Sequence, residues 1–250
     1  SIIKKIKNQK NLKLIDISKE FENIKNTFLF SESNFKIKNL AMAIKALKLS
    51  GFKHKMIYRS IKKIKDVDGR LELVKRFQNG IKVYIDYAHT PDALLKTLSS
   101  LEKNYGDKIS LVFGCGGDRD QKKRPLMAKI AGKYCKKIYI TDDNPRNENP
   151  KKIRDELFKH IAKNKVQNIG NRKLAIKTAI QNATVKEVVL IAGKGHEKQQ
   201  IYKNRILKIS DKKIVKDLKL IGKKINKKKH NFIQNRLFLK KILGKIKNVN

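Results

Sequence analysis

The chain has 250 residues, enough to bury a sizeable hydrophobic core in one large domain or two small ones. It carries 62 Lys and Arg against 22 Asp and Glu, a formal net charge of +40 at pH 7. Two isolated cysteines exclude a disulfide framework and a zinc site, and no apolar run approaches the roughly 20 residues of a membrane span. The N-terminus lacks the apolar core of a signal peptide, so we expect a cytoplasmic protein in a reducing setting.

The positive charge is spread over almost every segment, mainly as lysine beside many isoleucines and asparagines. A nucleic-acid surface would concentrate Lys and Arg where they displace counterions from phosphates, whereas a uniform excess is typical of drift in codon usage. We therefore expect neither a nucleic-acid nor a membrane partner. The alternative function is a noncatalytic basic module that binds nucleic acid or anionic surfaces. The segment 221–250 favours this alternative, because it has ten Lys or Arg and no acid.

The first part of the chain is predicted to contain short extended pieces followed by helices. In 39–52 four apolar residues recur at helical spacing, and Gly51 can end the helix. The four are Leu40, Ala43, Ile44 and Leu47. A similar pattern continues over 56–64, and the turn sequence DVDGR at 66–70 breaks it. We place a domain boundary at this turn. The predicted parts are 1–68, 69–220 and a basic tail, 221–250, which forms a further helix or a loose extension.

From residue 71 apolar runs rich in Val and Ile alternate with helical stretches. The predicted strands are 83–88, 109–116, 136–143 and 187–195. The predicted helices are 91–101, 124–134, 150–162 and 173–183. Strands that alternate with helices of this length indicate βαβ units, so we predict an α/β fold with a mainly parallel sheet.

Polar residues cluster directly after the four predicted strands. The clusters are DYAHTP (86–91), GCGGDRDQKKRP (114–125), TDDNPR (141–146) and GKGHE (193–197). Ligands of open α/β sheets bind beyond the carboxyl ends of the strands, so we expect these four loops to converge on one rim. Each cluster by itself is also an ordinary turn, since Asp, Asn, Pro and Gly commonly end strands. A turn alone does not explain Arg146 and Glu148.

The second and fourth clusters have the composition of loops that bind ionic groups. Backbone amides of the glycine run at 114–117 can bind an anion. The cations that would add positive charge there are Arg119, Lys122, Lys123 and Arg124. In the fourth cluster Glu197 can accept from an ammonium group. The chain contains no Walker-type phosphate-binding loop.

The histidines and cysteines give weaker indications. His89 can act as a base, contact phosphate or serve as a structural hydrogen-bond donor, and the same alternatives apply to His196. Cys115 is expected to be a small buried residue, because no partner base is evident. We predict no metal site within this chain.

Taken together and in this order, DYAHTPDAL, FGCGGDRDQKKRPLM, TDDNPR and IAGKGHE resemble the C-terminal part of the MurE-type Mur ligases. The resemblance extends from residue 35 to residue 215. It implies a three-domain enzyme with a UDP-sugar domain, a central P-loop ATPase domain and a Rossmann-like C-terminal domain. Such enzymes use ATP and Mg²⁺ to form an acyl phosphate on UDP-N-acetylmuramoyl-L-alanyl-D-glutamate, which the amine of meso-diaminopimelate then attacks.

The resemblance also implies roles for individual residues. The implied catalytic residues are His89 and Arg119. The implied meso-diaminopimelate contacts are Arg119, Asp143, Asn144, Pro145, Arg146, Gly193 and Glu197. The implied ATP contacts are Asn39, Arg70, Asp86 and His89. Arg146 would bind the second carboxylate of meso-diaminopimelate through two charge-assisted hydrogen bonds, and lysine has no carboxylate there. Asp68 stands where the family usually has proline, which weakens the assignment of Arg70.

On the same resemblance, the UDP-sugar domain and the P-loop would precede Ser1. We therefore expect 1–68 to be the remnant of the central ATPase domain and 69–220 to be the Rossmann-like domain that binds the amino acid. The chain would be an inactive part of a truncated or split ligase of peptidoglycan biosynthesis. ATP and Mg²⁺ would act in the complete enzyme, and the UDP-N-acetylmuramoyl dipeptide would bind through the upstream domains.

Overall fold

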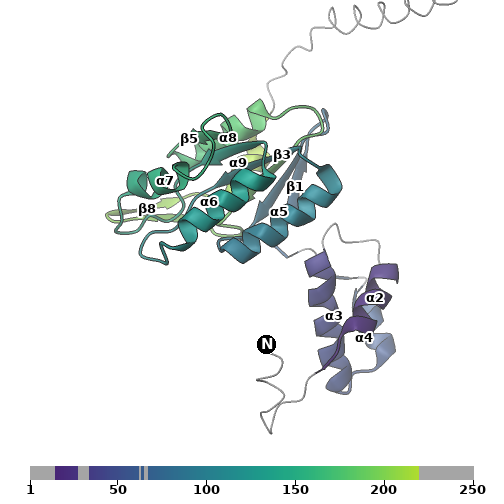
Figure 1. The fold of residues 1–250 in the computed structure, drawn as a ribbon. Helices are drawn as coiled ribbons and strands as arrows, with labels where there is room; N and C mark the ends of the chain where they lie inside the picture. Colours follow the sequence, from purple (N-terminus) through teal and green to yellow (C-terminus); the bar gives the residue numbers. More distant parts are fainter. Residues whose placement is uncertain (1–14, 28–33, 62, 65–66, 220–250) are drawn as a thin grey trace, which may run out of the picture. The chain divides into compact units, whose positions relative to one another are not determined.

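The computed structural model describes residues 15–27, 34–61, 63–64 and 67–219 of the chain (Figure 1). The predicted basic tail, 221–250, lies outside these ranges, as does most of the N-terminal segment predicted to be extended. The three predicted parts of the chain stay predictions.

The first described elements are helices α2 (Ser18–Thr27), α3 (Asn34–Leu49) and α4 (His54–Ile61). They enclose a small apolar cluster of their own, made of Ile24, Ile37, Ala41, Ile44, Ile57 and Ile61. The helix predicted at 39–52 is present but begins five residues earlier. Its predicted apolar face is partly wrong, because Ala43 and Leu47 are exposed and the buried stripe runs through Ile37, Ala41 and Ile44.

The rest of the described chain is built on a six-stranded sheet with the order β1-β2-β6-β3-β4-β5. The strands are β1 (Glu72–Arg76), β2 (Lys82–Asp86), β3 (Ile109–Phe113), β4 (Lys137–Ile140), β5 (Val166–Asn168) and β6 (Val188–Ala192). Only β1 is antiparallel to its neighbour, and the other pairings are parallel. The predicted α/β fold with a mainly parallel sheet is confirmed.

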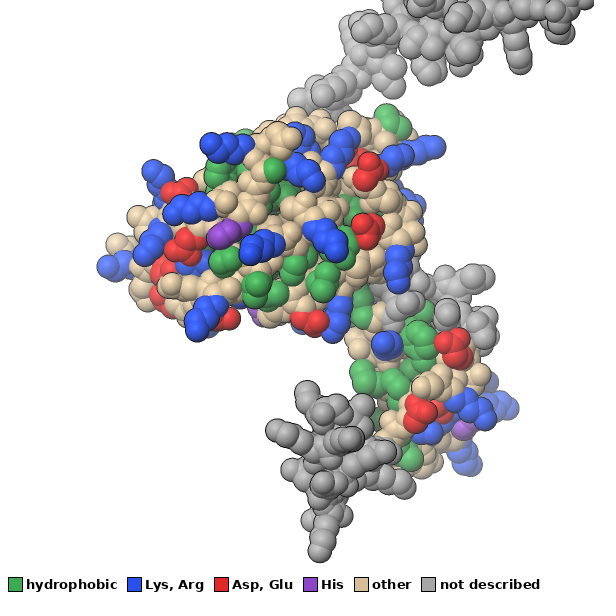
Figure 2. All heavy atoms as spheres, viewed as in Figure 1, with side chains coloured by type: hydrophobic (Ala, Val, Ile, Leu, Met, Phe, Trp, Pro, Cys, Tyr) green, Lys and Arg blue, Asp and Glu red, His purple; other side chains and the backbone are tan. Residues whose placement is uncertain are grey.

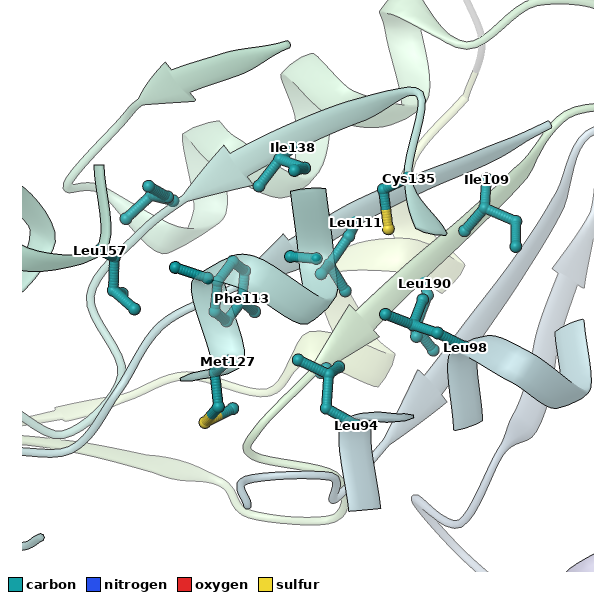
Figure 3. Packing of buried hydrophobic residues seen from close by; sticks show 14 of the residues in the cluster. Leu94, Leu98, Ile109, Leu111, Phe113, Met127, Cys135, Ile138, Leu157 and Leu190 are labelled. Carbon is teal, nitrogen blue, oxygen red and sulfur yellow. The ribbon is translucent and has the colours of Figure 1, made fainter. Parts of the chain in front are cut away.

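Helices cover both faces of this sheet (Figure 1). One face carries α5 (Pro91–Tyr105), α6 (Lys123–Tyr134) and α7 (Pro150–Phe158), and the other carries α8 (Arg172–Asn182) and α9 (Asp211–Asp217). Side chains of α5 to α7 and of the strands form one buried cluster, in which Leu98, Leu111 and Leu190 lie close together (Figure 3). Because side chains alternate along a strand, Val189 and Ile191 of β6 are buried on the opposite face.

Polar caps begin the helices that follow the loops. Thr90 accepts from the backbone N–H of Ala93 at the start of α5, and Asn149 accepts from two backbone N–H groups at the start of α7. Proline follows both caps, and its fixed φ suits the first helical position. These signals fix the points at which the loops end.

Several short elements were not predicted. They are α2, β1, β5, α9 and the antiparallel hairpin of β7 (Gln199–Tyr202) and β8 (Arg205–Lys208). On the surface seen in Figure 2, Lys and Arg side chains are interspersed with acidic and apolar ones over the α/β domain. Of the helices described, none combines the length and apolar character needed to cross a bilayer.

Candidate functional site

The four polar loops border one cleft of about 560 Å³ at the carboxyl ends of β2, β3, β4 and β6. The prediction that they converge is therefore confirmed. Of the predicted site residues, those that line the cleft are His89, Arg119, Asp143, Asn144, Arg146, Gly193 and Glu197. Pro145, Asp86, Arg70 and Asn39 do not line it.

The amide of Asn144 is committed to contacts within the protein. Its Oδ1 accepts from Lys194 Nζ at 3.0 Å and from the backbone N–H of Ile201 at 3.0 Å, and its Nδ2 donates to Glu197 Oε2 at 3.1 Å. Ile201 lies on β7, so the hairpin holds Asn144 from one side. Asn144 thus positions Glu197, and its role toward a ligand stays a prediction.

Glu197 is half-buried at the edge of the cleft, and its pKa is lowered. Burial by itself would raise the pKa of this carboxyl, but hydrogen bonds from Lys194, Asn144 and Tyr87, together with the charge of Lys194, outweigh burial. Lys194 is almost fully buried, and its Nζ lies 2.9 Å from Glu197 Oε2. Glu197 is therefore held ionised and ready to accept from an ammonium group.

Asp143 adds a second carboxylate to the cleft, and it is 9% exposed. No donor among the described residues hydrogen-bonds to its buried Oδ2 atom. A Cβ added at Gly193 would lie 2.6 Å from this oxygen, and Gly193 has a φ of +109°, where side chains are strained. Glycine at 193 thus leaves room for Asp143, whose free oxygen is suited to an incoming cation.

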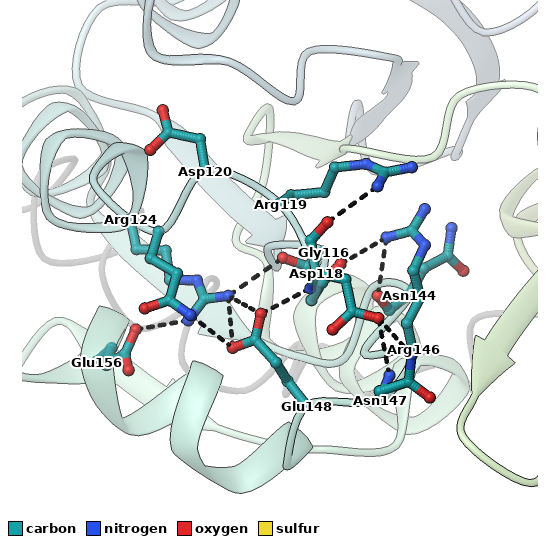
Figure 4. A network of polar contacts seen from close by, with 12 residues as sticks. Gly116, Asp118, Arg119, Asp120, Arg124, Asn144, Arg146, Asn147, Glu148 and Glu156 are labelled. Carbon is teal, nitrogen blue, oxygen red and sulfur yellow. Dashed lines mark hydrogen bonds and ion pairs between the residues drawn. The ribbon is translucent and has the colours of Figure 1, made fainter.

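Two arginines bring positive charge to the same cleft (Figure 4). Arg146 is half-buried with a φ of +51°, and its Nη1 donates to the carbonyl oxygens of Gly117 (2.9 Å) and Asn144 (3.3 Å). Arg119 is exposed, and its Nη1 donates to the carbonyl oxygen of Asp118 at 2.9 Å. The cleft thus combines two guanidinium groups with the carboxylates of Asp143 and Glu197.

The turn around Pro145 packs directly against the glycine run. The backbone N–H of Gly117 donates to the carbonyl oxygen of Asn144 at 2.9 Å. A Cβ at Gly117 would overlap the carbonyl oxygen of Pro145. Pro145 is buried and does not line the cleft. It therefore contributes to the contact between the two loops.

The residues predicted to contact ATP are placed differently from one another. The Asp86 carboxylate is buried, accepts from Ala88 N–H and from Thr97 Oγ1 at 3.0 Å each, and holds the loop after β2. Burial raises the pKa of Asp86, against the lowering effect of these two donors. Asn39 is exposed on α3. Their contacts with ATP stay predictions.

Arg70 and His89 meet at the ring of Tyr87. The guanidinium carbon of Arg70 lies 4.4 Å from the centre of the Tyr87 ring, and the rings of Tyr87 and His89 meet edge to face at 4.6 Å. His89 Nδ1 lies 2.8 Å from the Tyr87 carbonyl oxygen, which can only accept, so Nδ1 carries a proton. The other ring nitrogen, Nε2, is the one that can act on a ligand.

The prediction that Arg124 adds positive charge to an anion site is wrong. Arg124 is fully buried rather than facing an anion, and its guanidinium binds Glu148 and Glu156 (Figure 4). This contact explains Glu148, which turn chemistry left unexplained. Lys194 was also missed, although it stands inside the GKGHE cluster, because the sequence gives no sign that its side chain points inward.

Within the described ranges, no three His, Cys, Asp or Glu side chains gather where they could hold a metal ion. We assign no magnesium contact to these residues.

Comparison with known proteins identifies the family. The family model of the Mur ligase glutamate ligase domain matches residues 69–195. The chain belongs to the Mur ligase family. Members of this family are ATP-dependent amide ligases.

Relatives of known name match the same region of this Mur ligase chain. A UDP-N-acetylmuramoyl-L-alanyl-D-glutamate--2,6-diaminopimelate ligase of Rickettsia typhi is 44% identical over 185 residues, covering 73% of this chain and 37% of that protein. The ligase of the same name from Buchnera aphidicola of Acyrthosiphon pisum is 45% identical over 192 residues, covering 76% and 38%. The chain thus spans less than half the length of these curated relatives.

Solved structures agree with the fold. A solved structure of a UDP-N-acetylmuramoyl-L-alanyl-D-glutamate--2,6-diaminopimelate ligase matches with a TM-score of 0.57 and 33% identity, covering 74% of this chain and 38% of that one. The folylpolyglutamate synthase of Mycobacterium tuberculosis, complexed with ADP and AMPPCP, matches with a TM-score of 0.52 at 18% identity and shows the fold alone.

Proposed function

We propose that this chain binds meso-diaminopimelate for a ligase of peptidoglycan biosynthesis in the cytoplasm. In the complete reaction, ATP would activate the D-glutamate carboxyl of UDP-N-acetylmuramoyl-L-alanyl-D-glutamate as an acyl phosphate, and the bound amine would attack it. The observation that carries the proposal is the cleft in which Arg146 and Arg119 lie with Asp143 and Glu197. The comparisons give no support to the alternative of a noncatalytic basic module.

The charges of the cleft match those of the amino acid. Meso-diaminopimelate carries an ammonium and a carboxylate at each end, whereas lysine carries only an ammonium at its far end. The carboxylates of Asp143 and Glu197 suit the distal ammonium, and the guanidinium of Arg146 suits the distal carboxylate. Arg119 lies at the same cleft and suits the carboxylate at the reacting end. Lysine would leave Arg146 without its partner.

The contribution of this chain to catalysis is orientation. Holding the amine near an activated carboxyl replaces a bimolecular encounter by a reaction between bound groups. His89 at the rim of the cleft, with Nε2 directed away from its Tyr87 contact, is suited to take a proton from the amine. Arg70 beside Tyr87 is suited to contact nucleotide phosphate when ATP is bound.

A titration of the ¹⁵N-labelled chain with meso-diaminopimelate and with L-lysine, followed by NMR, tests the proposal. We expect at least about tenfold tighter binding of meso-diaminopimelate, because one lost charge-assisted interaction costs about 1.5–3 kcal/mol. Arg146→Lys should reduce this preference, since an ammonium cannot present two parallel donors. The matched control is Arg76→Lys on β1, which is exposed and away from the cleft. Equal affinity for both amino acids, or no saturable shift with either, would refute the proposal.

A further inference from the structure

The loop after β3 and the loop after β4 are joined by direct contacts (Figure 4). We call 114–122 the glycine loop and 141–149 the recognition loop. The backbone N–H of Asn147 and its Nδ2 atom donate to Asp118 Oδ2 at 3.2 and 2.7 Å, and Arg146 Nη1 donates to the Gly117 carbonyl oxygen. The guanidinium of Arg146 therefore takes its position from the glycine loop as well as from its own.

Glu148 is the centre of these contacts. Its Oε1 accepts from the backbone N–H of Asp118 at 2.6 Å, and both carboxylate oxygens lie 2.9 Å from Arg124 Nη2. Its Oε2 also lies 3.4 Å from Gln121 Nε2. One carboxylate of the recognition loop thus binds the glycine loop at two points and the start of α6 at a third.

Arg124 holds the Glu148 carboxylate in place through its buried guanidinium. Its side chain is 0% exposed, so its charge needs carboxylate partners close by. On its other side, Nη1 donates to Glu156 Oε2 of α7 at 2.7 Å. The two carboxylates bind the same guanidinium, but Glu156 belongs to helix α7, whereas Glu148 also binds the glycine loop through Asp118 and Gln121.

The backbone at Arg146 needs such support. A non-glycine residue with a φ of +51° occupies a less favourable conformation, which persists only where neighbouring contacts hold it. Glu148 lies two residues further along the same loop. Neither Glu148 nor Arg124 lines the cleft.

We propose that the Arg124–Glu148 ion pair is a positioning element that fixes the guanidinium of Arg146 for the second carboxylate of the amino acid. Neither residue touches the ligand. The pair acts by locking the recognition loop onto the glycine loop, so that Arg146 is in place before the amino acid arrives. This inference rests on the proposed function and assigns the residues that set its specificity.

The test compares Glu148→Gln with Glu156→Gln. Each variant removes one negative charge from the same buried guanidinium, so Glu156→Gln shows what the loss of that charge does by itself. We expect Glu148→Gln to reduce the preference for meso-diaminopimelate over L-lysine at least about tenfold, and Glu156→Gln to keep the wild-type ratio. The ratio is measured by NMR titration, and thermal melting reports the folding of each variant.

The outcomes separate this inference from the proposed function. A wild-type chain without preference refutes the proposed function itself. A wild-type preference that survives in Glu148→Gln, or is lost equally in both variants, overturns only the positioning role. Glu148→Gln unfolded beside a folded Glu156→Gln would also overturn it, because Glu148 would then support the whole domain. Glu148→Asp, which keeps the charge but shortens the side chain, should fall between wild type and Glu148→Gln in preference.

Discussion

Removing one partner of the buried ion pair between Arg172 and Asp211 should be among the most destabilising single substitutions in the α/β part of the chain. Arg172 begins α8 and Asp211 begins α9, and both side chains are at most 1% exposed. Arg172 Nε donates to Asp211 Oδ1 at 2.9 Å, and Nη2 donates to Oδ2 at 2.7 Å. Nη2 also donates to the Ala192 carbonyl oxygen at 3.1 Å. Asp211→Asn would therefore leave a buried guanidinium without its paired carboxylate.

The expected loss follows from this burial. Removing one partner of a buried pair costs about 3–5 kcal/mol, and the amide oxygen that Asn retains favours the lower figure. In a domain of about 150 residues each kcal/mol lowers Tm by about 2–4 °C, so we expect a fall of about 6–12 °C. Urea denaturation and calorimetry of the chain measure both quantities. Since Ala192 precedes Gly193, weaker binding of meso-diaminopimelate should accompany the loss.

An exposed pair provides the control. Lys213 and Asp217 lie 3.3 Å apart on α9 with side chains 79% and 63% exposed, and Asp217→Asn should change stability by less than about 0.5 kcal/mol. A double variant, Arg172→Met with Asp211→Leu, should recover most of the loss, because apolar residues of similar volume replace a buried pair well. A Tm change in Asp211→Asn no larger than in Asp217→Asn would refute the reasoning.

Three further predictions concern the cleft. Gly117→Ala should weaken binding of meso-diaminopimelate by about tenfold or more in the NMR titration, because its Cβ would overlap the Pro145 carbonyl oxygen, whereas Gly132→Ala, in open space on α6, should preserve binding. Because the pKa of Glu197 lies below its usual 4.5 in the folded chain, its contribution to stability is present above that value and is lost as the pH falls through the lowered pKa. Glu197→Gln should therefore show a shallower loss of stability in urea denaturation experiments as the pH falls below 4.5, and equal slopes would contradict this. Burial raises the pKa of the Cys115 thiol to about 12, so iodoacetamide at about pH 8 should alkylate it on the order of a thousandfold more slowly than free cysteine, and rapid labelling of the native chain would disprove this.

The central strands and their helices could be predicted because their sequence patterns are strong. In β3 and β6 every residue is buried, and such runs of Val, Ile and Leu stand out between helical stretches. The missed strands lack this signal. In β8 all four residues are exposed, and β5 has only three residues. Short exposed strands form because a neighbour pairs with them, which a single sequence does not reveal.

In the site too, features set by local sequence could be predicted, and features set by distant contacts could not. Its motif residues could be placed, because each directly follows a recognisable strand and parallel strands end at one edge. The partners of Arg124 could not, since Glu148 and Glu156 follow 24 and 32 positions later in the chain. Whether an arginine faces a ligand or a carboxylate of the protein itself depends on such distant contacts. Lys194 was overlooked because one of its two partners, Asn144, is 50 positions away, and the nearby Glu197 does not show by itself that the lysine side chain is buried.

The position of β6 has a consequence for how the chain is made. This strand is synthesised after β5, yet it lies in the middle of the sheet and pairs with both β2 and β3. Until the ribosome has released it, β1–β2 and β3–β4–β5 remain two separate half-sheets, each with an open apolar edge that invites pairing with other chains. A nascent chain that ends before residue 188 should therefore depend on chaperones and aggregate readily.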